Sequence, residues 1–210
     1  MIGLAIHTSS PELGLAIVDN TGHVRSEVWP LGRDLSSYLH DRLIHFLPPH
    51  QWTELTFLAV AQGPGGFTGT RIGVVAARTL AQQLAIPLFG ISSLAAIAHQ
   101  THHANPKQHS RTASDDIAVK MRAQRGETFG AIYRCSEHEL ISVLDEKIYT
   151  QADWHHVLES WEKPCHLIAA EGGLAASVSG ILALAQAQWL AGDRPNWQTV
   201  LPFYGQHPVR

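Results

Sequence analysis

Cysteine and clustered positive charge are both scarce in this sequence. Its 210 residues include two cysteines, Cys135 and Cys165, and no Cys-x-x-Cys pair, which excludes a disulfide scaffold. Lysine and arginine number 15 against 18 aspartates and glutamates, so the net charge is −3, and the cations are scattered along the chain. Affinity for DNA or RNA depends on clustered cations, so we do not expect this chain to hold a nucleic acid by itself.

Targeting and membrane signals are weak as well. The N-terminal residues MIGLAIH lack the basic segment, apolar run and cleavage site of a signal peptide, so we expect a cytoplasmic protein. Residues 172–192 carry no charge and approach the ~20 residues of a membrane span. Alanine dominates this stretch, however, and Ser177, Ser179, Gln186 and Gln188 are spread through it. We therefore expect a buried or half-buried helix and no membrane association.

Familiar catalytic motifs are missing too. The sequence has no Gly-x-Ser-x-Gly elbow, and neither cysteine has a neighbouring base apart from His166 beside Cys165. In a sheet protein of this type that handles ATP we would expect an acidic residue in the first strand, where His7 stands instead. The residues alone therefore provide no convincing catalytic set.

Fourteen histidines raise the question of a metal site. His99 and His103 have i, i+4 spacing, with His102 and His109 nearby, whereas a zinc site also needs a third ligand and a fixed geometry. The stretch contains no clustered carboxylate or cysteine, which favours a solvated, histidine-rich loop. We expect this chain to hold no metal.

What the sequence does contain is the pattern of an α/β protein. Hydrophobic residues make up 45% of the chain, and its length suits one ordinary domain or two small lobes. Apolar runs and helical stripes predict the order βββαβαβ and then a short helix ending near residue 99, which favours a mixed sheet flanked by helices. The polar, histidine-rich residues 99–114 are typical of a surface linker. We expect a first lobe over 1–103, a linker over 104–114, and a smaller second lobe over 115–210 whose last segment is a candidate to return to the first lobe.

Residues 59–94 organise the rest of the first lobe. A short apolar run meets a glycine-dense turn at Gly63, Gly65 and Gly66, and a helical pattern follows from about Thr68. The Thr68 side chain is predicted to cap amide groups in the first turn of that helix. A second apolar strand comes next, so the stretch forms a strand–turn–helix–strand unit.

The helix of this unit carries small residues at every fourth position, which are Gly69, Gly73, Ala77, Ala81 and Ala85. Each glycine costs roughly 1 kcal/mol of helix propensity relative to alanine, which suggests that another backbone approaches closely. Three interpretations stay open: close packing inside the fold, a surface that docks a partner helix, and a turn that cradles a phosphate. The phosphate interpretation is the weakest, because the glycine spacing is one residue longer than the dinucleotide fingerprint and no Lys-Ser or Lys-Thr follows.

Four segments, taken in order, resemble the bacterial TsaB family, also called YeaZ: GLAIHTSSPELGLAIVD, GPGGFTGTRIGVVAARTLA, GISSLAAIA and RGETFGAIY. The similarity is strongest over residues 1–98. It implies an α/β protein with the actin-like ATPase/Hsp70/sugar-kinase (ribonuclease H-like) fold, in which two lobes have mixed sheets flanked by helices. It also implies a non-catalytic relative of the catalytic TsaD subunit.

The resemblance further implies a function in tRNA modification. With TsaD and the ATPase TsaE, the family supports transfer of threonylcarbamoyl from threonylcarbamoyl-AMP to N6 of the adenosine next to the anticodon, in tRNAs that read codons beginning with A. ATP and metal are then expected on the partner subunits, and contact with tRNA only through the complex. The metal-binding HxxxH helix of TsaD corresponds here to GISSLAAIA, with Ser93 and Ile97 at the histidine positions.

Carried over to this sequence, the resemblance predicts that helices of the first lobe pair with TsaD or, when the chain is alone, with a second copy in a homodimer. The predicted interface residues are Gly69, Arg71, Gly73, Ala77, Ala81, Leu39 and Leu43. The candidates for a residual phosphate-binding turn are Gly63, Gly65, Gly66, Thr8 and Ser9.

Two departures from the family pattern weaken any nucleotide or metal role for this chain. The first strand ends in His7-Thr8-Ser9 where the family commonly has Asp-Thr-Ser, and residues 122–127 are RAQRGE where it usually has a sequence like DARRGE. Each change removes an acid. The alternative function is an independent enzyme, either a TsaD-like metallopeptidase ("glycoprotease") or a small ATP-binding, kinase-like enzyme, and it would need metal or ATP.

Overall fold

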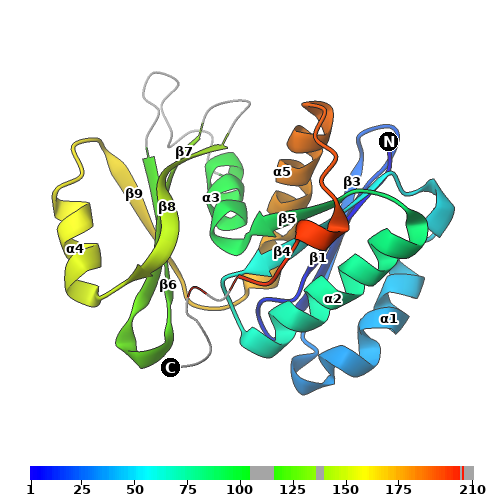
Figure 1. The fold of residues 1–210 in the computed structure, drawn as a ribbon, viewed down its shortest axis with the longest axis horizontal. Coiled ribbons are helices and arrows are strands. Elements are labelled where there is room, and N and C mark those ends of the chain that lie inside the picture. Colours follow the sequence, from blue (N-terminus) through cyan, green and yellow to red (C-terminus); the bar gives the residue numbers. More distant parts are fainter. Residues whose placement is uncertain (105–115, 136–139, 204, 206–210) are drawn as a thin grey trace.

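Two β-sheets, one in each lobe, organise the chain (Figure 1). The computed structural model describes residues 1–104, 116–135, 140–203 and 205. The predicted α/β architecture, with mixed sheets flanked by helices, is confirmed. The linker expected over residues 104–114 lies outside the described residues from residue 105 onward.

The first lobe is built on a five-stranded sheet in the order β3-β2-β1-β4-β5. Its strands are β1 (Gly3–His7), β2 (Leu13–Val18), β3 (Val24–Trp29), β4 (Phe57–Gly63) and β5 (Leu88–Ser92). The first three pair antiparallel, whereas β4 and β5 join in parallel on the other side of β1. Every residue of β1 and β2 is buried, because helices cover both faces of the sheet at its centre.

Four helices cover this sheet, two on each face (Figure 1). One face carries α1 (Leu35–Phe46) and α2 (Phe67–Leu84), and the other carries α3 (Ser93–Ala104) and α5 (Val178–Leu190). Helix α5 packs on β1, β2 and β4 although it follows the whole second sheet in sequence. The chain therefore builds the second lobe and then returns to the first.

The second lobe is a four-stranded sheet in the order β8-β7-β6-β9. Its strands are β6 (Asp116–Arg122), β7 (Thr128–Cys135), β8 (Leu140–Tyr149) and β9 (Cys165–Ala170). Helix α4 (Gln151–Glu159) covers one face, and α3 covers the other, so α3 lies between the two sheets (Figure 1). A buried Asp116 carboxylate accepts two hydrogen bonds from Arg134 and one from the Trp161 indole, which fixes the end of β6.

Short 3₁₀ helices complete the described chain. They are η1 (Gly32–Asp34), η2 (Trp52–Glu54), η3 (Gln124–Gly126), η4 (Leu174–Ser177) and η5 (Trp197–Thr199). After α5 the chain runs back along β4 and β5, where the Leu88 amide donates to the Pro195 carbonyl and the Phe203 amide to the Gln62 carbonyl. The Phe203 side chain then packs into the core of the second lobe. The last described residues therefore contact both lobes.

One sequence-based boundary differs from the structure. Helix α3 continues to Ala104, whereas the sequence predicted an end near residue 99. The last turn of α3 is polar because it is partly exposed to solvent, and not because the helix has ended. Within this turn the His103 ring is hydrogen-bonded to the His99 carbonyl. The uncharged stretch over 172–192 forms η4 and α5, and no helix among the described residues has the length and apolarity to cross a membrane.

Candidate functional site

The glycines of α2 lie directly against the end of β1. A Cβ atom added at Gly69 would lie 2.2 Å from the Thr8 carbonyl oxygen, and one added at Gly73 would lie 2.1 Å from Thr8 Oγ1. The Thr8 hydroxyl in turn donates a 2.8 Å hydrogen bond to the Gly69 carbonyl. These contacts leave no room for a side chain, so the glycines permit the helix to pack on residues 8 and 9 of its own chain.

This packing corrects the predicted partner interface. Gly73, Ala77 and Ala81 are buried inside the first lobe, where they face β1 and β4. On α1, Leu39 and Leu43 are also buried, in the same core. A partner cannot contact these five residues while the chain is folded in this way. The four-residue spacing was correctly attributed to close approach, but the approaching backbone is the chain's own.

Of the other two predicted contact residues, Gly69 is half-buried against the Thr8 carbonyl, whereas Arg71 lies on the outward face of α2. The outward faces of α1 and α2 also carry several apolar side chains. Arg71 is exposed on α2, and its guanidinium lies 5.1 Å from the centre of the Phe67 ring. The large hydrophobic side chains that point to solvent are Val75 at 60% exposure, Ile44 at 59%, Tyr38 at 47% and Phe67 at 45%. On α2, Val75 belongs to a second apolar stripe beside the small-residue ridge, and the structure leaves it exposed while Ala77 and Ala81 of the ridge are buried.

The start of α2 differs from the prediction for Thr68. The helix begins at Phe67, and its N-cap is Gly66, which provides no side-chain cap. Thr68 therefore lies exposed within the first turn, and the residues of that turn, Phe67 to Gly69, line the space beside it. The backbone amides at a helix N-terminus generally favour negatively charged groups.

The candidate phosphate-binding turn is largely occupied by contacts within the chain. The Gly66 amide donates to the Ser9 carbonyl at 2.7 Å, and a Cβ atom at Gly65 would lie 2.2 Å from that same oxygen. Gly63 has a φ of 111°, and a Cβ there would lie 2.5 Å from the Phe203 carbonyl oxygen. Of the two hydroxyls, that of Thr8 donates to the Gly69 carbonyl, whereas the buried Ser9 hydroxyl has no hydrogen-bond partner among the described residues.

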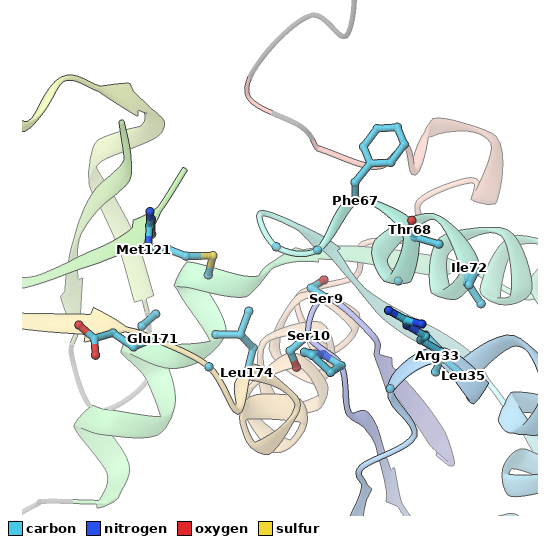
Figure 2. Close-up of a pocket in the computed structure, with 18 of the residues that line it drawn as sticks. Ser9, Ser10, Arg33, Leu35, Phe67, Thr68, Ile72, Met121, Glu171 and Leu174 are labelled. Carbon is cyan, nitrogen blue, oxygen red and sulfur yellow. The ribbon is translucent and has the colours of Figure 1, made fainter. Parts of the chain in front are cut away.

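A cleft of about 1200 Å³ lies between the two lobes, and Figure 2 shows the side chains that line it. The first lobe contributes Ser9 and Ser10 after β1, Arg33 from η1, and the start of α2. The second lobe contributes Met121, Arg122, Glu171 and Leu174, together with backbone from the neighbouring positions. The lining thus combines apolar side chains, hydroxyls, two arginines and one carboxylate, which suits a polar ligand with an apolar part.

His7 lies at the end of β1, near this cleft but sealed from solvent. Burial lowers the pKa of its imidazole to about 3, so the ring is neutral at ordinary pH. Its Nδ1 atom accepts a 3.3 Å hydrogen bond from the Ser9 amide, and its Nε2 atom has no hydrogen-bond partner in the described part of the chain. A neutral, buried imidazole cannot replace the charge of a carboxylate at this position.

The histidines of α3 form an aromatic cluster. The rings of His99 and His103 stack with centroids 4.1 Å apart, and His102 meets His103 edge-on at 5.3 Å. Burial, with the neighbouring His103 and His102, lowers the pKa of His99 to about 4. Within the residues that the structure describes, no group of three or more histidine, cysteine or acidic side chains is arranged to hold a metal. His109 lies outside the described residues.

Sequence reasoning missed one polar cluster, which joins the lobes. The Ser92 hydroxyl at the end of β5 hydrogen-bonds the Glu146 carboxylate of β8 and lies 3.5 Å from the Tyr133 hydroxyl of β7. Burial raises the pKa of Glu146 to about 7 and raises the pKa of Tyr133 as well. The three residues are far apart in sequence and belong to no common motif, so no sequence signal would have brought them together.

Comparisons with known proteins agree on one family. The family described as "TsaD: tRNA N6-adenosine threonylcarbamoyltransferase" matches residues 50–187, well over half of the chain. The chain is 29% identical over 163 residues to the tRNA threonylcarbamoyladenosine biosynthesis protein TsaB of Bacillus subtilis, covering 77% of this chain and 67% of that protein. It is 34% identical over 86 residues to the protein of the same name from Escherichia coli, covering 41% of this chain and 34% of that protein.

Solved structures establish the fold. YeaZ from Pseudomonas aeruginosa superimposes with a TM-score of 0.76 at 21% identity, over 97% of this chain and 99% of that one. A second structure, described as an uncharacterized protein with similarity to peptidase YEAZ from the same organism, gives a TM-score of 0.77 at 21% identity, over 98% of this chain and 99% of that one. The predicted actin-like (ribonuclease H-like) fold class is thereby confirmed.

Proposed function

Because the chain belongs to the TsaB (YeaZ) branch of the TsaD-related family, we propose that it is a subunit of the machinery that makes threonylcarbamoyladenosine in tRNA. In this proposal a TsaD protein transfers threonylcarbamoyl from threonylcarbamoyl-AMP to N6 of the adenosine next to the anticodon. The acceptors are tRNAs that read codons beginning with A. The present chain acts as the non-catalytic partner that activates TsaD.

The observation that supports a partner role is the outward face of α1 and α2. Val75 and Ile44 are each about 60% exposed on adjacent helices that cover one face of the first sheet. Exposed β-branched side chains on two helices offer an apolar surface that a pair of partner helices would bury. With Arg71 beside them, these side chains replace the buried ridge as the expected contact residues.

The end of β1 supports a non-catalytic role. Where a nucleotide-handling relative would use an acid, this chain has a buried His7 whose pKa is lowered to about 3. The neighbouring Thr8 hydroxyl is committed to the Gly69 carbonyl, which leaves it unable to donate to a ligand. We propose that ATP and metal are handled by the partners TsaD and TsaE, and that the chain meets tRNA only within the complex.

The same helix faces could pair with themselves. A two-fold axis would bring Val75 and Ile44 of one copy against the same helices of a second, which is the arrangement of most homodimers. We therefore propose that the chain forms a homodimer when TsaD is absent. Self-association and TsaD binding would then use one surface and compete.

The function is tested by reconstitution. Purified chain is mixed with TsaD and TsaE from the same organism, threonylcarbamoyl-AMP as donor, and ATP with Mg²⁺. Formation of the modified adenosine is then followed in a tRNA transcript, with the chain omitted as control. We expect modification to depend on the chain and the chain to co-elute with TsaD in gel filtration. Full modification without it, or modification by the chain without TsaD, would contradict the proposal.

The interlobe cleft favours one alternative, which is an independent enzyme that binds ATP or a metal. Ser9, whose buried hydroxyl has no hydrogen-bond partner among the described residues, lines the cleft together with the start of α2 and two arginines, Arg33 and Arg122. Calorimetric titration of the chain alone with ATP, with and without Mg²⁺, tests this alternative directly. Tight stoichiometric binding would support it, and no heat at millimolar ATP would eliminate the kinase-like version.

A further inference from the structure

The two lobes are joined through the N-terminus of α3, at residues that do not line the cleft. Ser92 precedes α3, and its hydroxyl oxygen accepts hydrogen bonds from the Leu94 amide at 3.1 Å and the Ala95 amide at 3.3 Å. These are the amides that a capping side chain normally satisfies. The same hydroxyl donates its proton to the carboxylate of Glu146, which belongs to β8 of the second lobe. One serine thus caps the helix and holds the other lobe.

We propose that the hydrogen bond between Glu146 and Ser92 holds the second lobe against α3, and that the strength of this contact depends on whether Glu146 is protonated. With Glu146 protonated the contact is closed, and with Glu146 ionised it is weakened. The proposal concerns the conformation of this chain alone, and it holds or fails independently of the proposed function.

Two opposing effects act on the Glu146 carboxyl. Its ionised form is favoured by the hydrogen bond from Ser92 and by the positive end of α3 that the serine caps. Burial between β8 and α3 disfavours the ionised form, and it prevails, because the pKa of Glu146 is raised from 4.5 to about 7. The carboxyl therefore gains and loses its proton near neutral pH.

Among the residues that the structure describes, the groups that face Glu146 do not compensate its charge. Tyr133, from β7, has its pKa raised by burial and by Glu146 itself, so it stays protonated and neutral. From β5 the facing group is the neutral Ser92, and from α3 the facing groups are backbone amides. Of the ionisable neighbours in sequence on β8, Asp145 and Lys147 are both exposed to solvent. Ionisation of Glu146 is therefore relieved most directly when β8 moves away from α3.

The direction of the pH effect follows from linkage. A carboxyl whose pKa is higher in the closed state than in the open state stabilises the closed state most at low pH. This stabilisation is complete below about pH 4.5 and is lost as the pH rises to about 7, after which no further change is expected. Within that window the ratio of open to closed molecules rises by up to about tenfold per pH unit, and less where water reaches the carboxyl.

The test is amide hydrogen exchange of the first turn of α3 in the full chain between pH 5 and pH 8, corrected for intrinsic rates. Glu146→Gln removes the charge and keeps the shape, and Asp145→Asn is the matched control, one residue away on the same strand but exposed. The buried histidines change the stability of the wild type and the variant alike in this pH range. The measured quantity is therefore the ratio of the wild-type exchange rate to the variant exchange rate, in which their effect cancels. We expect that ratio for Glu146→Gln to rise by about tenfold or more between pH 5 and pH 7 and then to level off. The Asp145→Asn variant should follow the wild type.

A ratio that stays constant with pH would overturn the proposal. Because Glu146→Gln could fail to fold, carbon-13 NMR titration of the Glu146 carboxyl in the wild type provides a second measurement. We expect its midpoint near pH 7, and a higher midpoint in Ser92→Ala, since that variant loses the hydrogen bond that lowers the pKa. A midpoint near 4.5, or one that Ser92→Ala leaves unchanged, would also refute the proposal.

Discussion

The two faces of α2 differ in what occupies them. The inner face carries Gly69, Gly73, Ala77 and Ala81, and it is filled by residues 8 and 9 and the core of the same chain. The outer face carries Arg71 and Val75, both exposed. Small residues at helical spacing thus indicate a close contact without saying whose backbone makes it. The side chains that a partner would meet are those left outside after the chain's own packing is complete.

The largest effect is expected on the inner face, at Gly73. A Cβ atom there would lie 2.1 Å from Thr8 Oγ1 and 3.2 Å from Thr8 Cβ, so Gly73→Leu requires α2 to move away from β1. We expect the free energy of unfolding to fall by at least about 3 kcal/mol, or the chain to fail to fold. Urea denaturation measures this, with Val75→Leu on the outer face as the control. Wild-type stability in Gly73→Leu would show that the inner face is not closed as described.

The next effect is on pH dependence, at His7. Its pKa is lowered in the folded state from 6.5 to about 3, so the stability that it provides is present above pH 6.5 and is lost as the pH falls. Between pH 6.5 and pH 4.5 this loss is about 2 kcal/mol for a fully buried imidazole. His7→Asn, which does not titrate, should show a flatter stability profile over this range, whatever its absolute stability. An unchanged acid slope would mean that His7 becomes protonated in the folded chain without cost.

A smaller effect is expected at Thr8, which fastens the first turn of α2. Thr8→Val keeps the shape and removes the hydroxyl that donates to the Gly69 carbonyl at 2.8 Å. We expect a loss of about 1 kcal/mol, while Thr8→Ser, which keeps the donor, should lose less. Thermal unfolding of the three proteins side by side makes the comparison. If Thr8→Val were as stable as the wild type, the contact of α2 with β1 would rest on the glycines alone.

The smallest effect on stability is expected on the outer face. Val75→Glu places a good helix former at a position that is 60% exposed, so the free energy of unfolding should change by no more than about 0.5 kcal/mol. The same denaturation experiment as for Gly73 checks this. A large loss of stability would show that Val75 supports the fold and is not a free contact residue.

Much of the fold could be predicted from the sequence, because hydrophobic periodicity fixes where strands and helices lie. The buried strands β1 and β2 follow from continuous apolar runs, and the apolar stripe of α1 follows from its helical spacing. The end of α3 was missed because its last turn is polar on a half-buried helix. The site was predicted less well: glycine spacing identified α2 as the central element and left close packing, docking and phosphate binding open, whereas the family resemblance assigned its inner face to a partner. The Ser92–Glu146 contact depends on tertiary structure alone.

The most direct test of the central claim compares TsaD binding by outer-face and control variants. Binding to TsaD from the same organism is measured by gel filtration and calorimetry. The double variant Ile44→Glu, Val75→Glu is compared with the control variant Leu190→Glu and with the wild type. Leu190 is an equally apolar residue, 71% exposed on α5, on the opposite side of the first sheet. We predict that all three proteins fold, that Leu190→Glu binds TsaD like the wild type, and that the double variant loses binding by at least about tenfold. Unchanged binding by the double variant would contradict the assignment of the α1 and α2 outer face to the partner.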